Sequence, residues 1–258
     1  MKFLGLAAVC ATALMAMASP AAARPDFRCN GVFKGKTYDE VIVPRNAACT
    51  LIDATVTGNV RALRNSYFQT VGTAIGGDVE GSASQTIFID AGSKVSGSVE
   101  SVGAREFFVF NSTVMEDIEP ERTKEVVQIC GNTVRRGNIE VRRSGPGNGG
   151  TTKHPGTDIL IGDPLTVGCR GNLVKRGDIK VTRNFTDIEF VIRGNTIRRG
   201  DLQVLKNTGP VQKLVESNIG GDRLVCRENS FAAASGNTGW ERKLGQCATR
   251  ISRLGPLR

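Results

Sequence analysis

The chain has few of the residues on which most catalytic and metal sites depend. It contains one histidine, His154, and aromatic residues make up only 5% of its 258 residues. No Cys-x-x-Cys pair occurs, so a zinc site built from cysteine and histidine is not expected. A single histidine in a Gly- and Pro-rich segment also gives no support to Ser-His or Cys-His nucleophilic catalysis. We predict no catalytic residues, no metal and no cofactor.

Long hydrophobic runs are absent beyond the first residues of the chain. After Met17, no stretch approaches the roughly 20 apolar residues that a transmembrane helix needs. Before it, Lys2 precedes an apolar run that starts at Phe3, and residues 21–23 offer an Ala-x-Ala cleavage site. This pattern is typical of a secretory signal peptide. We expect residues 1–23 to be cleaved near Ala23, which would leave a secreted, periplasmic or cell-surface chain without a transmembrane segment.

Basic residues outnumber acidic residues. Lys2 is the only charged residue of the expected signal peptide, so the remaining chain carries 33 basic and 25 acidic side chains, a net charge of +8. Two interpretations stay open, because net charge informs about solubility and non-specific binding rather than fold. The first is an anionic polysaccharide or other cell-envelope polyanion as partner, and the second is a solvated charged surface. No specific nucleic-acid partner is expected.

A short segment recurs about eight times along the chain. Each copy has a Thr-Val-like pair, a turn containing Gly-Asn or Gly-Asp, and a closing aliphatic residue. The copies from residue 133 to residue 202 have one additional residue in the turn. A steady period near 20 residues, with short segments rich in Val, Ile and Thr, indicates strands joined by tight turns. The closing aliphatic residues are Val60, Val79, Val99, Ile118, Ile139, Ile179, Leu202 and Leu224.

These repeats predict an all-β fold, a single-stranded right-handed parallel β-helix of about eight coils. One coil cannot bury its own apolar side chains, whereas coils stacked about 4.8 Å apart place Val60 over Val79 over Val99 in a continuous column. A second strand precedes each turn, for example at residues 86–89 and 107–110. A β-sandwich is the alternative, but it would not need the same turn so many times.

The repeat also sets the domain boundaries. We expect the β-helix to occupy residues 24–235 and residues 236–258 to form a C-terminal cap or tail. The step from Ile139 to Ile179 is twice the usual length, and its Gly- and Pro-rich composition predicts an insertion loop at about residues 144–164. His154 lies in this loop.

Six cysteines remain after the signal peptide, which predicts disulfide bonds in an exported chain, although six cysteines allow 15 pairings. Cys130 and Cys169 occupy nearly the same place on successive coils, so we expect them to be bridged. The other four would then join the two ends of the stack, where strand edges need protection. They are Cys29 with Cys49 and Cys226 with Cys247.

Basic residues recur at the same phase in the last three full coils. Like charges stacked at strand spacing repel each other, and a bound anion would relieve that repulsion. In the alternative interpretation, Asp178 and Asp201 neutralise the neighbouring cations. The candidate binding residues form three columns: Arg135, Lys175 and Arg198; Arg136, Arg176 and Arg199; and Arg143, Arg183 and Lys206.

Other recurrent residues have structural explanations. Four asparagines at one phase predict a hydrogen-bonded side-chain ladder: Asn132, Asn172, Asn195 and Asn218. The Arg-Gly-Asp triplets at residues 176–178 and 199–201 are the turn of the repeat rather than an adhesion motif. Glycosylation triplets begin at Asn111 and Asn184 and matter only in a host that glycosylates exported proteins.

Residues 41–51, followed by residues 54–60 and 75–79, form a pattern that extends over most of residues 29–230. By this pattern the chain resembles exported bacterial right-handed parallel β-helix proteins without an assigned activity. The resemblance implies the fold that pectate-lyase-like enzymes share, while no residue matches their catalytic pattern.

Three functions are therefore compared: a non-catalytic binding or structural module, a self-associating scaffold, and a polysaccharide lyase or glycoside hydrolase. For the enzyme, Asp178 and Asp201 would be the paired carboxylates, but no aromatic sugar platform accompanies them in the sequence.

Overall fold

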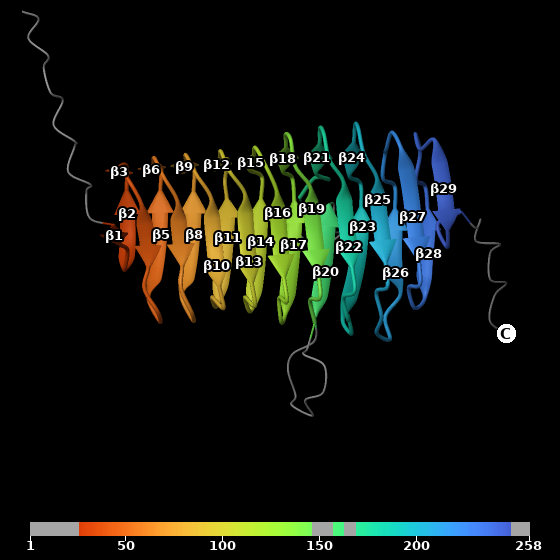
Figure 1. Ribbon diagram of the computed structural model, residues 1–258, viewed down its shortest axis with the longest axis horizontal. Coiled ribbons are helices and arrows are strands. Elements are labelled where there is room, and N and C mark those ends of the chain that lie inside the picture. Colours follow the sequence, from red (N-terminus) through yellow and green to blue (C-terminus); the bar gives the residue numbers. More distant parts are fainter. Residues whose placement is uncertain (1–25, 146–156, 163–168, 249–258) are drawn as a thin grey trace, which may run out of the picture.

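The computed structural model describes residues 26–145, 157–162 and 169–248 of the chain. Within these residues every regular element is a β-strand and every strand pairing is parallel. The strands stack in three sheets along one axis and form a β-solenoid of about ten turns (Figure 1). The expected all-β parallel solenoid is confirmed.

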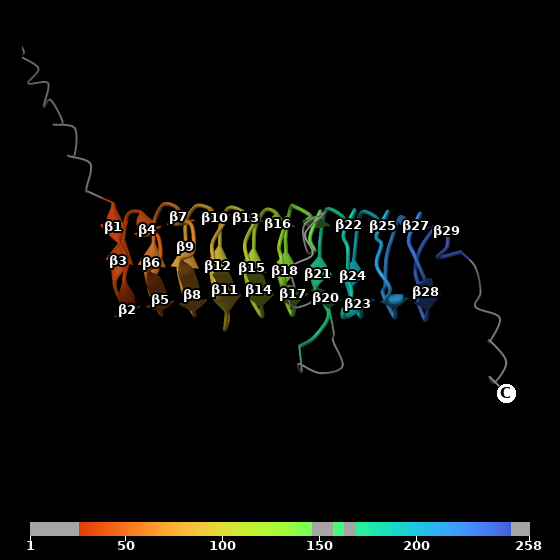
Figure 2. The same ribbon diagram turned by 90° about the horizontal axis from the view of Figure 1, so that it is seen from below.

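Most turns contribute one strand to each of three sheets, here called sheets A, B and C (Figure 2). Sheet A contains β1 (Phe27–Arg28), β4 (Val41–Val43), β7 (Val60–Ala62), β10 (Val79–Ser82), β13 (Val99–Val102), β16 (Ile118–Glu121), β19 (Ile139–Arg142), β22 (Ile179–Thr182), β25 (Leu202–Leu205), β27 (Arg223–Arg227) and β29 (Arg242–Gly245).

Sheet B contains β2 (Gly31–Lys34), β5 (Ala48–Ile52), β8 (Tyr67–Val71), β11 (Thr86–Asp90), β14 (Glu106–Phe110), β17 (Val126–Cys130), β20 (Asp158–Gly162), β23 (Glu189–Arg193), β26 (Lys213–Glu216) and β28 (Ala232–Ser235). Sheet C contains the two-residue strands β3 (Thr37–Tyr38), β6 (Thr55–Val56), β9 (Ala74–Ile75), β12 (Lys94–Val95), β15 (Thr113–Val114), β18 (Thr133–Val134), β21 (Leu173–Val174) and β24 (Thr196–Ile197).

The predicted aliphatic column forms the centre of the core. Its eight residues, from Val60 to Leu224, are paired one to the next in sheet A, and each has 0% of its surface exposed. Alternate side chains along each strand point into the solenoid or out of it, as the two-residue period of a strand requires. The register of the stack therefore follows from the phase of the repeat alone.

The predicted number of eight coils is too low. A further turn precedes the first recognised copy, because Thr37 pairs with Thr55 and Val41 pairs with Val60. Another follows the last copy, where a bridge joins Ile219 to Thr238. In the first of these turns, Asp39 and Glu40 stand directly before the closing Val41, so a search for Gly-Asn or Gly-Asp misses it.

The expected insertion loop, about residues 144–164, contains a strand, so the prediction is wrong for β20. This strand lies between β17 and β23 in sheet B, and Ile159 and Ile161 are buried in the core. The strand was not recognised from the sequence, because a short apolar run beside a Gly- and Pro-rich stretch gives little periodicity. His154 lies outside the described residues.

All three expected disulfides are present. Cys130 and Cys169 have Cα atoms 5.7 Å apart. The pairs Cys29–Cys49 and Cys226–Cys247 join neighbouring turns near the two ends of the solenoid, with Cα separations of 5.4 and 5.1 Å. Each bridge ties one turn to the next and so lowers the conformational entropy of the unfolded chain. Disulfides are typical of proteins that fold in oxidising compartments.

The predicted asparagine ladder is confirmed, and it is longer than expected. Each amide nitrogen donates to the side-chain oxygen of the next asparagine at 2.9–3.1 Å, from Asn132 as far as Asn237. A second buried ladder, which the sequence did not reveal to us, runs through Asn184, Asn207, Asn229 and Gln246. Because every rung satisfies buried polar groups, both ladders fix the register of the turns.

Aromatic residues lie at both ends of the solenoid. At the first turns, the rings of Phe27 and Tyr38 are stacked with centroids 4.2 Å apart, and Phe33 packs edge-on at 4.9 Å from Phe27. Near the last turn, the indole of Trp240 lies where a side chain on Gly220 would point. Gly220 has the same position in its turn as the buried Ile197 has one turn earlier. The indole of Trp240 fills the space that a side chain at Gly220 would otherwise occupy.

Candidate anion-binding surface

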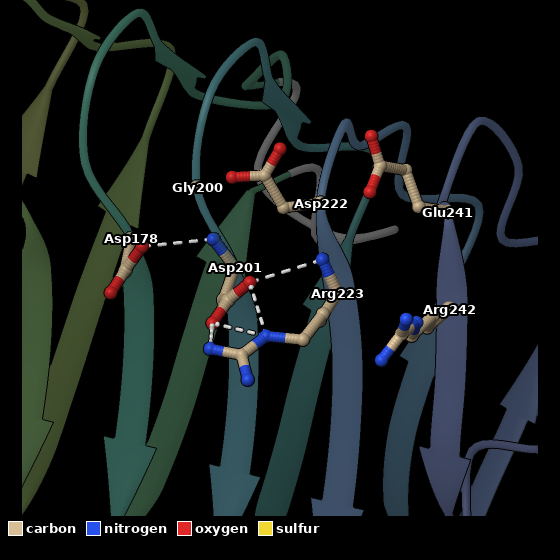
Figure 3. A pocket seen from close by; sticks show the side chains of 7 residues that line it. All are labelled: Asp178, Gly200, Asp201, Asp222, Arg223, Glu241 and Arg242. Carbon is tan, nitrogen blue, oxygen red and sulfur yellow. Dashed lines mark hydrogen bonds and ion pairs between the residues drawn. The ribbon is translucent and has the colours of Figure 1, made fainter.

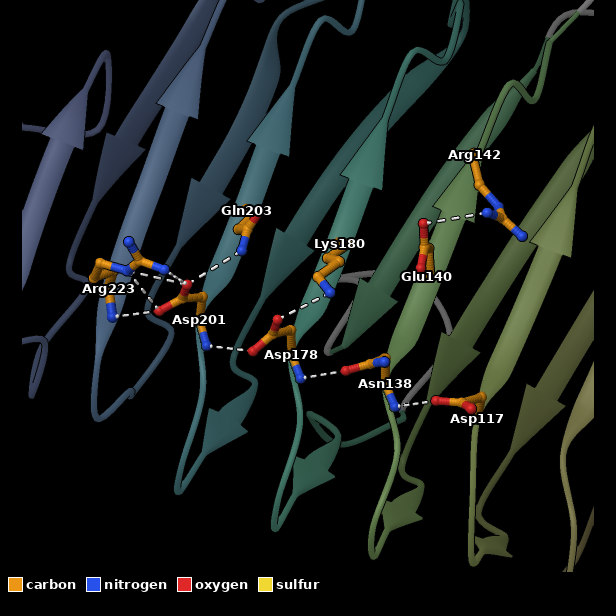
Figure 4. A network of polar contacts seen from close by, with 9 residues as sticks. All are labelled: Asp117, Asn138, Glu140, Arg142, Asp178, Lys180, Asp201, Gln203 and Arg223. Carbon is orange, nitrogen blue, oxygen red and sulfur yellow. Dashed lines mark hydrogen bonds and ion pairs between the residues drawn. The ribbon is translucent and has the colours of Figure 1, made fainter.

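The corner between sheets C and A is organised by a third ladder. In seven successive turns, the side chain before the closing aliphatic residue accepts a hydrogen bond from the backbone N–H of its counterpart in the next turn, at 2.6–3.3 Å. Figure 4 shows this ladder from Asp117 to Arg223. The accepting side chains belong to Asn59, Asp78, Ser98, Asp117, Asn138, Asp178 and Asp201. This corner ladder explains why Asn and Asp recur at this phase.

Asp178 and Asp201 are held by this ladder. Oδ2 of Asp178 lies 3.1 Å from Nζ of Lys180, and both oxygens of Asp201 accept hydrogen bonds from Arg223. Burial raises the pKa of Asp201, but the hydrogen bonds and charge of Arg223 outweigh it, so the pKa is lowered overall. A general acid needs a raised pKa. The geometry thus favours a turn-stabilising role for these two carboxylates.

Three consecutive corners have one residue more than the others. They are the corners that follow β18, β21 and β24, and the additional residue places an arginine before the corner glycine. Gly177 and Gly200 have φ values of 136° and 133°, and a Cβ on either would lie 2.2 Å from a carbonyl oxygen of the preceding turn. Only glycine fits there, and the arginine before it is exposed.

Two of the three predicted basic columns lie together at these long corners. Arg135, Lys175 and Arg198 directly follow the paired strands of sheet C, and an arginine follows each of them in the chain. We call these six residues the basic ridge; they are Arg135, Arg136, Lys175, Arg176, Arg198 and Arg199. Lys175 is half-buried and the five arginines are exposed.

The third predicted column lies apart from the ridge. Arg143, Arg183 and Lys206 come directly after β19, β22 and β25, at the corner between sheets A and B, where their φ values are 53–58°. Arg143 pairs with Glu121 at 3.0 Å, and Lys206 pairs with Glu228 at 3.6 Å. The four-residue strands of sheet A separate this column from the ridge, so the nine predicted residues do not form one surface.

The ridge cations have no direct partners among the described side chains. In the part of the chain that the structure describes, none of its six side chains has an ion pair or a hydrogen-bonded partner. Asp178 and Asp201, which the alternative interpretation would pair with these cations, form their ion pairs with Lys180 and Arg223. Stacked cations at strand spacing repel one another and favour a bound anion.

Acidic residues lie beyond both ends of the ridge. In the turn before it, Met115 and the exposed Glu116 precede the corner. Asp222 in the turn after it, and Glu241 one turn further on, border a hollow of about 480 Å³ (Figure 3). The hollow is lined by Asp178, Gly200, Asp201, Asp222, Arg223, Glu241 and Arg242. The basic ridge is therefore three turns long and no longer.

Sheet A has an acidic outer column that our sequence analysis missed. Glu80, Glu100 and Glu119 are paired from strand to strand, and Glu140 follows in the next turn. Burial, followed by the charges of nearby carboxylates, raises the pKa values of Glu100 and Glu119. The signal was present in the sequence, since each glutamate directly follows a closing aliphatic residue.

Sheet B has an aromatic cluster on its outer face. The rings of Phe88, Phe108 and Phe110 lie with centroids 5.5–5.8 Å apart and are half-buried. No aromatic platform was expected from the sequence, where these residues were recognised only as parts of strands. The cluster lies on a different sheet from the basic ridge.

Comparison with family models, curated proteins and solved structures finds no match for the chain. In the described ranges, no helix is long and apolar enough to cross a membrane. Nor does any group of three or more His, Cys, Asp or Glu side chains, among the residues that the structure describes, have an arrangement that would hold a metal ion.

Proposed function

We propose that this protein is an exported, non-catalytic β-solenoid that binds anionic polysaccharide at the cell surface or in the periplasm. The observation that carries the proposal is the basic ridge, in which six cationic side chains in three consecutive turns have no carboxylate partner among the described residues. Export is proposed from the signal-peptide pattern of residues 1–23, which lie outside the described part of the chain.

Arginine suits such a ligand. Its guanidinium forms two parallel hydrogen bonds with a carboxylate or sulfate, and it is more weakly hydrated than an ammonium group. Five of the six ridge residues are arginines. A rigid, disulfide-tied stack also holds their Cα atoms in place, so less entropy is lost when a polymer binds.

Affinity chromatography and calorimetry on an anionic polysaccharide test the proposal. The mature protein should bind, and the binding should weaken as salt screens the charges. Replacing Arg136, Arg176 and Arg199 by serine should weaken binding about tenfold or more, if each lost contact is worth about 0.5–1 kcal/mol.

A matched control removes the same charge elsewhere. Replacing Arg143, Arg183 and Lys206 by serine lowers the net charge equally, but at the corner between sheets A and B. We expect this variant to keep most of the affinity. Equal loss in both variants would show that only the total charge matters, and no retention of the unaltered protein would refute the proposed function.

A further inference from the structure

We infer that the basic ridge is a track for a linear glycan that lies parallel to the solenoid axis and carries an anionic group on every sugar. The inference rests on the proposed function and specifies the ligand of the same site. It follows from three features: the spacing of the ridge residues, the column of glycines beside the ridge on its sheet A side, and its limited length.

The spacing of the ridge is set by the backbone. Thr133, Leu173 and Thr196 pair in register in sheet C, and each is followed two and three residues later by the ridge cations. Neighbouring parallel strands are about 4.8 Å apart. A pyranose unit in an extended chain advances by about this length, so a polymer along the axis presents one sugar to each turn.

The direction of the track follows from what lies beside it. Next to the arginines, toward sheet A, comes a column of glycines, Gly137, Gly177 and Gly200. The column after that belongs to the corner ladder, whose side chains bind backbone N–H groups. A polymer that crossed the ridge would contact the two cations of a single turn, whereas one that follows the axis contacts all six.

The length of the track is fixed by its acidic ends. Glu116 precedes it, and Asp222 follows it at the first corner that lacks the additional residue. An anionic polymer is repelled at both positions. Affinity should therefore rise with oligomer length up to about the three sugars that span the ridge, while longer chains should bind several protein molecules each.

Calorimetry with two oligosaccharide series of equal total charge tests the spacing. Oligomannuronate has a carboxylate on every sugar and hyaluronan on every second sugar, so oligomers can be matched in their number of carboxylates. We expect the mannuronate oligomer to bind about fivefold or more tightly, because each turn then finds its own anion. Equal affinity for the two would overturn the track but leave the proposed function intact, whereas binding of neither would overturn both.

A gain-of-function variant tests the direction and length. Glu116→Arg adds a cation directly before the ridge and should lengthen the track by one turn. Affinity for a long mannuronate oligomer should rise about two- to fivefold, and the length at which affinity levels off should increase by one sugar.

The control Glu228→Arg makes the same charge change at the other corner, in a column that already holds Arg183 and Lys206. An equal gain from Glu228→Arg would contradict the axial track. An increase in affinity for Glu116→Arg without any change in the length dependence would also contradict it.

Discussion

Arg223 terminates the corner ladder by binding Asp201 through both its backbone and its side chain. Its backbone nitrogen lies 3.0 Å from Oδ1 of Asp201, and its Nη2 lies 2.6 Å from Oδ2. Asp201 is only 5% exposed, and the next turn has Arg242 at this position instead of a ladder acceptor. The guanidinium of Arg223 thus pairs with the carboxylate of Asp201, which is the last acceptor of the ladder.

Replacing Arg223 by methionine should destabilise the fold by about 1–3 kcal/mol, because a buried carboxylate loses its charged partner. The pKa of Asp201 is lowered in the folded chain. Its contribution to stability is therefore present above the pKa of the unfolded carboxyl and is lost as the pH falls through the folded value. Urea denaturation at neutral and acidic pH should show the difference from the unaltered protein shrinking in acid. The control Arg242→Met should have little effect, and equal destabilisation by both variants would contradict this role.

Lys213 should give the protein a distinctive response to alkaline pH. It is fully buried in β26, where its Nζ donates to the carbonyl oxygens of Gly209 and Val211 and to Ser230, at 2.7–3.2 Å. Burial lowers its pKa from 10.5, so the unfolded chain binds more protons than the folded chain in the range below that value. Stability from this group rises with pH there. The free energy of unfolding should be measured against pH for the unaltered protein and for Lys213→Met, and the difference between the two curves should show this rise. If the two curves are parallel, Lys213 is not responsible.

The middle of the first asparagine ladder should be sensitive to substitution. Oδ1 of Asn195 accepts from the backbone and side chain of Asn172, while its Nδ2 donates to Ile161 and Asn218. Asn195→Leu leaves these buried groups unsatisfied, and we expect a loss of about 2–4 kcal/mol in the free energy of unfolding. Thr238→Ala, at an exposed position near the same sheet, should change it by less than about 0.5 kcal/mol. A small effect of Asn195→Leu would mean that the ladder is not a stabilising element.

The two glycosylation triplets should behave differently in a eukaryotic secretory host. Asn111 is exposed at a turn, whereas the amide of Asn184 is buried and donates to Asn207 at 2.9 Å and to the carbonyl of Val141 at 3.1 Å. A glycan on Asn184 would prevent these bonds. The secreted, folded protein should therefore carry one glycan, removed by Asn111→Gln and unaffected by Asn184→Gln. Mass spectrometry of the secreted protein checks this, and a glycan found on Asn184 would contradict the second ladder.

Parts of the fold were predictable because an in-register parallel stack places residues of equal phase in one column. The aliphatic column from Val60 to Leu224, the Cys130–Cys169 bridge and the ladder from Asn132 to Asn218 all follow from counting along the repeat. The same counting failed at the turn that ends with Val41, which lacks the glycine signature. It also failed at β20, where a loop-like composition adjoins a buried strand.

The sequence by itself determined the solenoid, its period, its disulfides and which basic residues share a column. Only the tertiary structure decided which columns meet, because the angle at each corner and the choice of each side chain's partner are not periodic properties. It put Arg143 across sheet A from Arg136, and it paired Asp178 and Asp201 with Lys180 and Arg223 rather than with the ridge. Those pairings leave the six ridge cations without carboxylate partners among the described residues. The proposal of an anionic ligand depends on these unpaired cations.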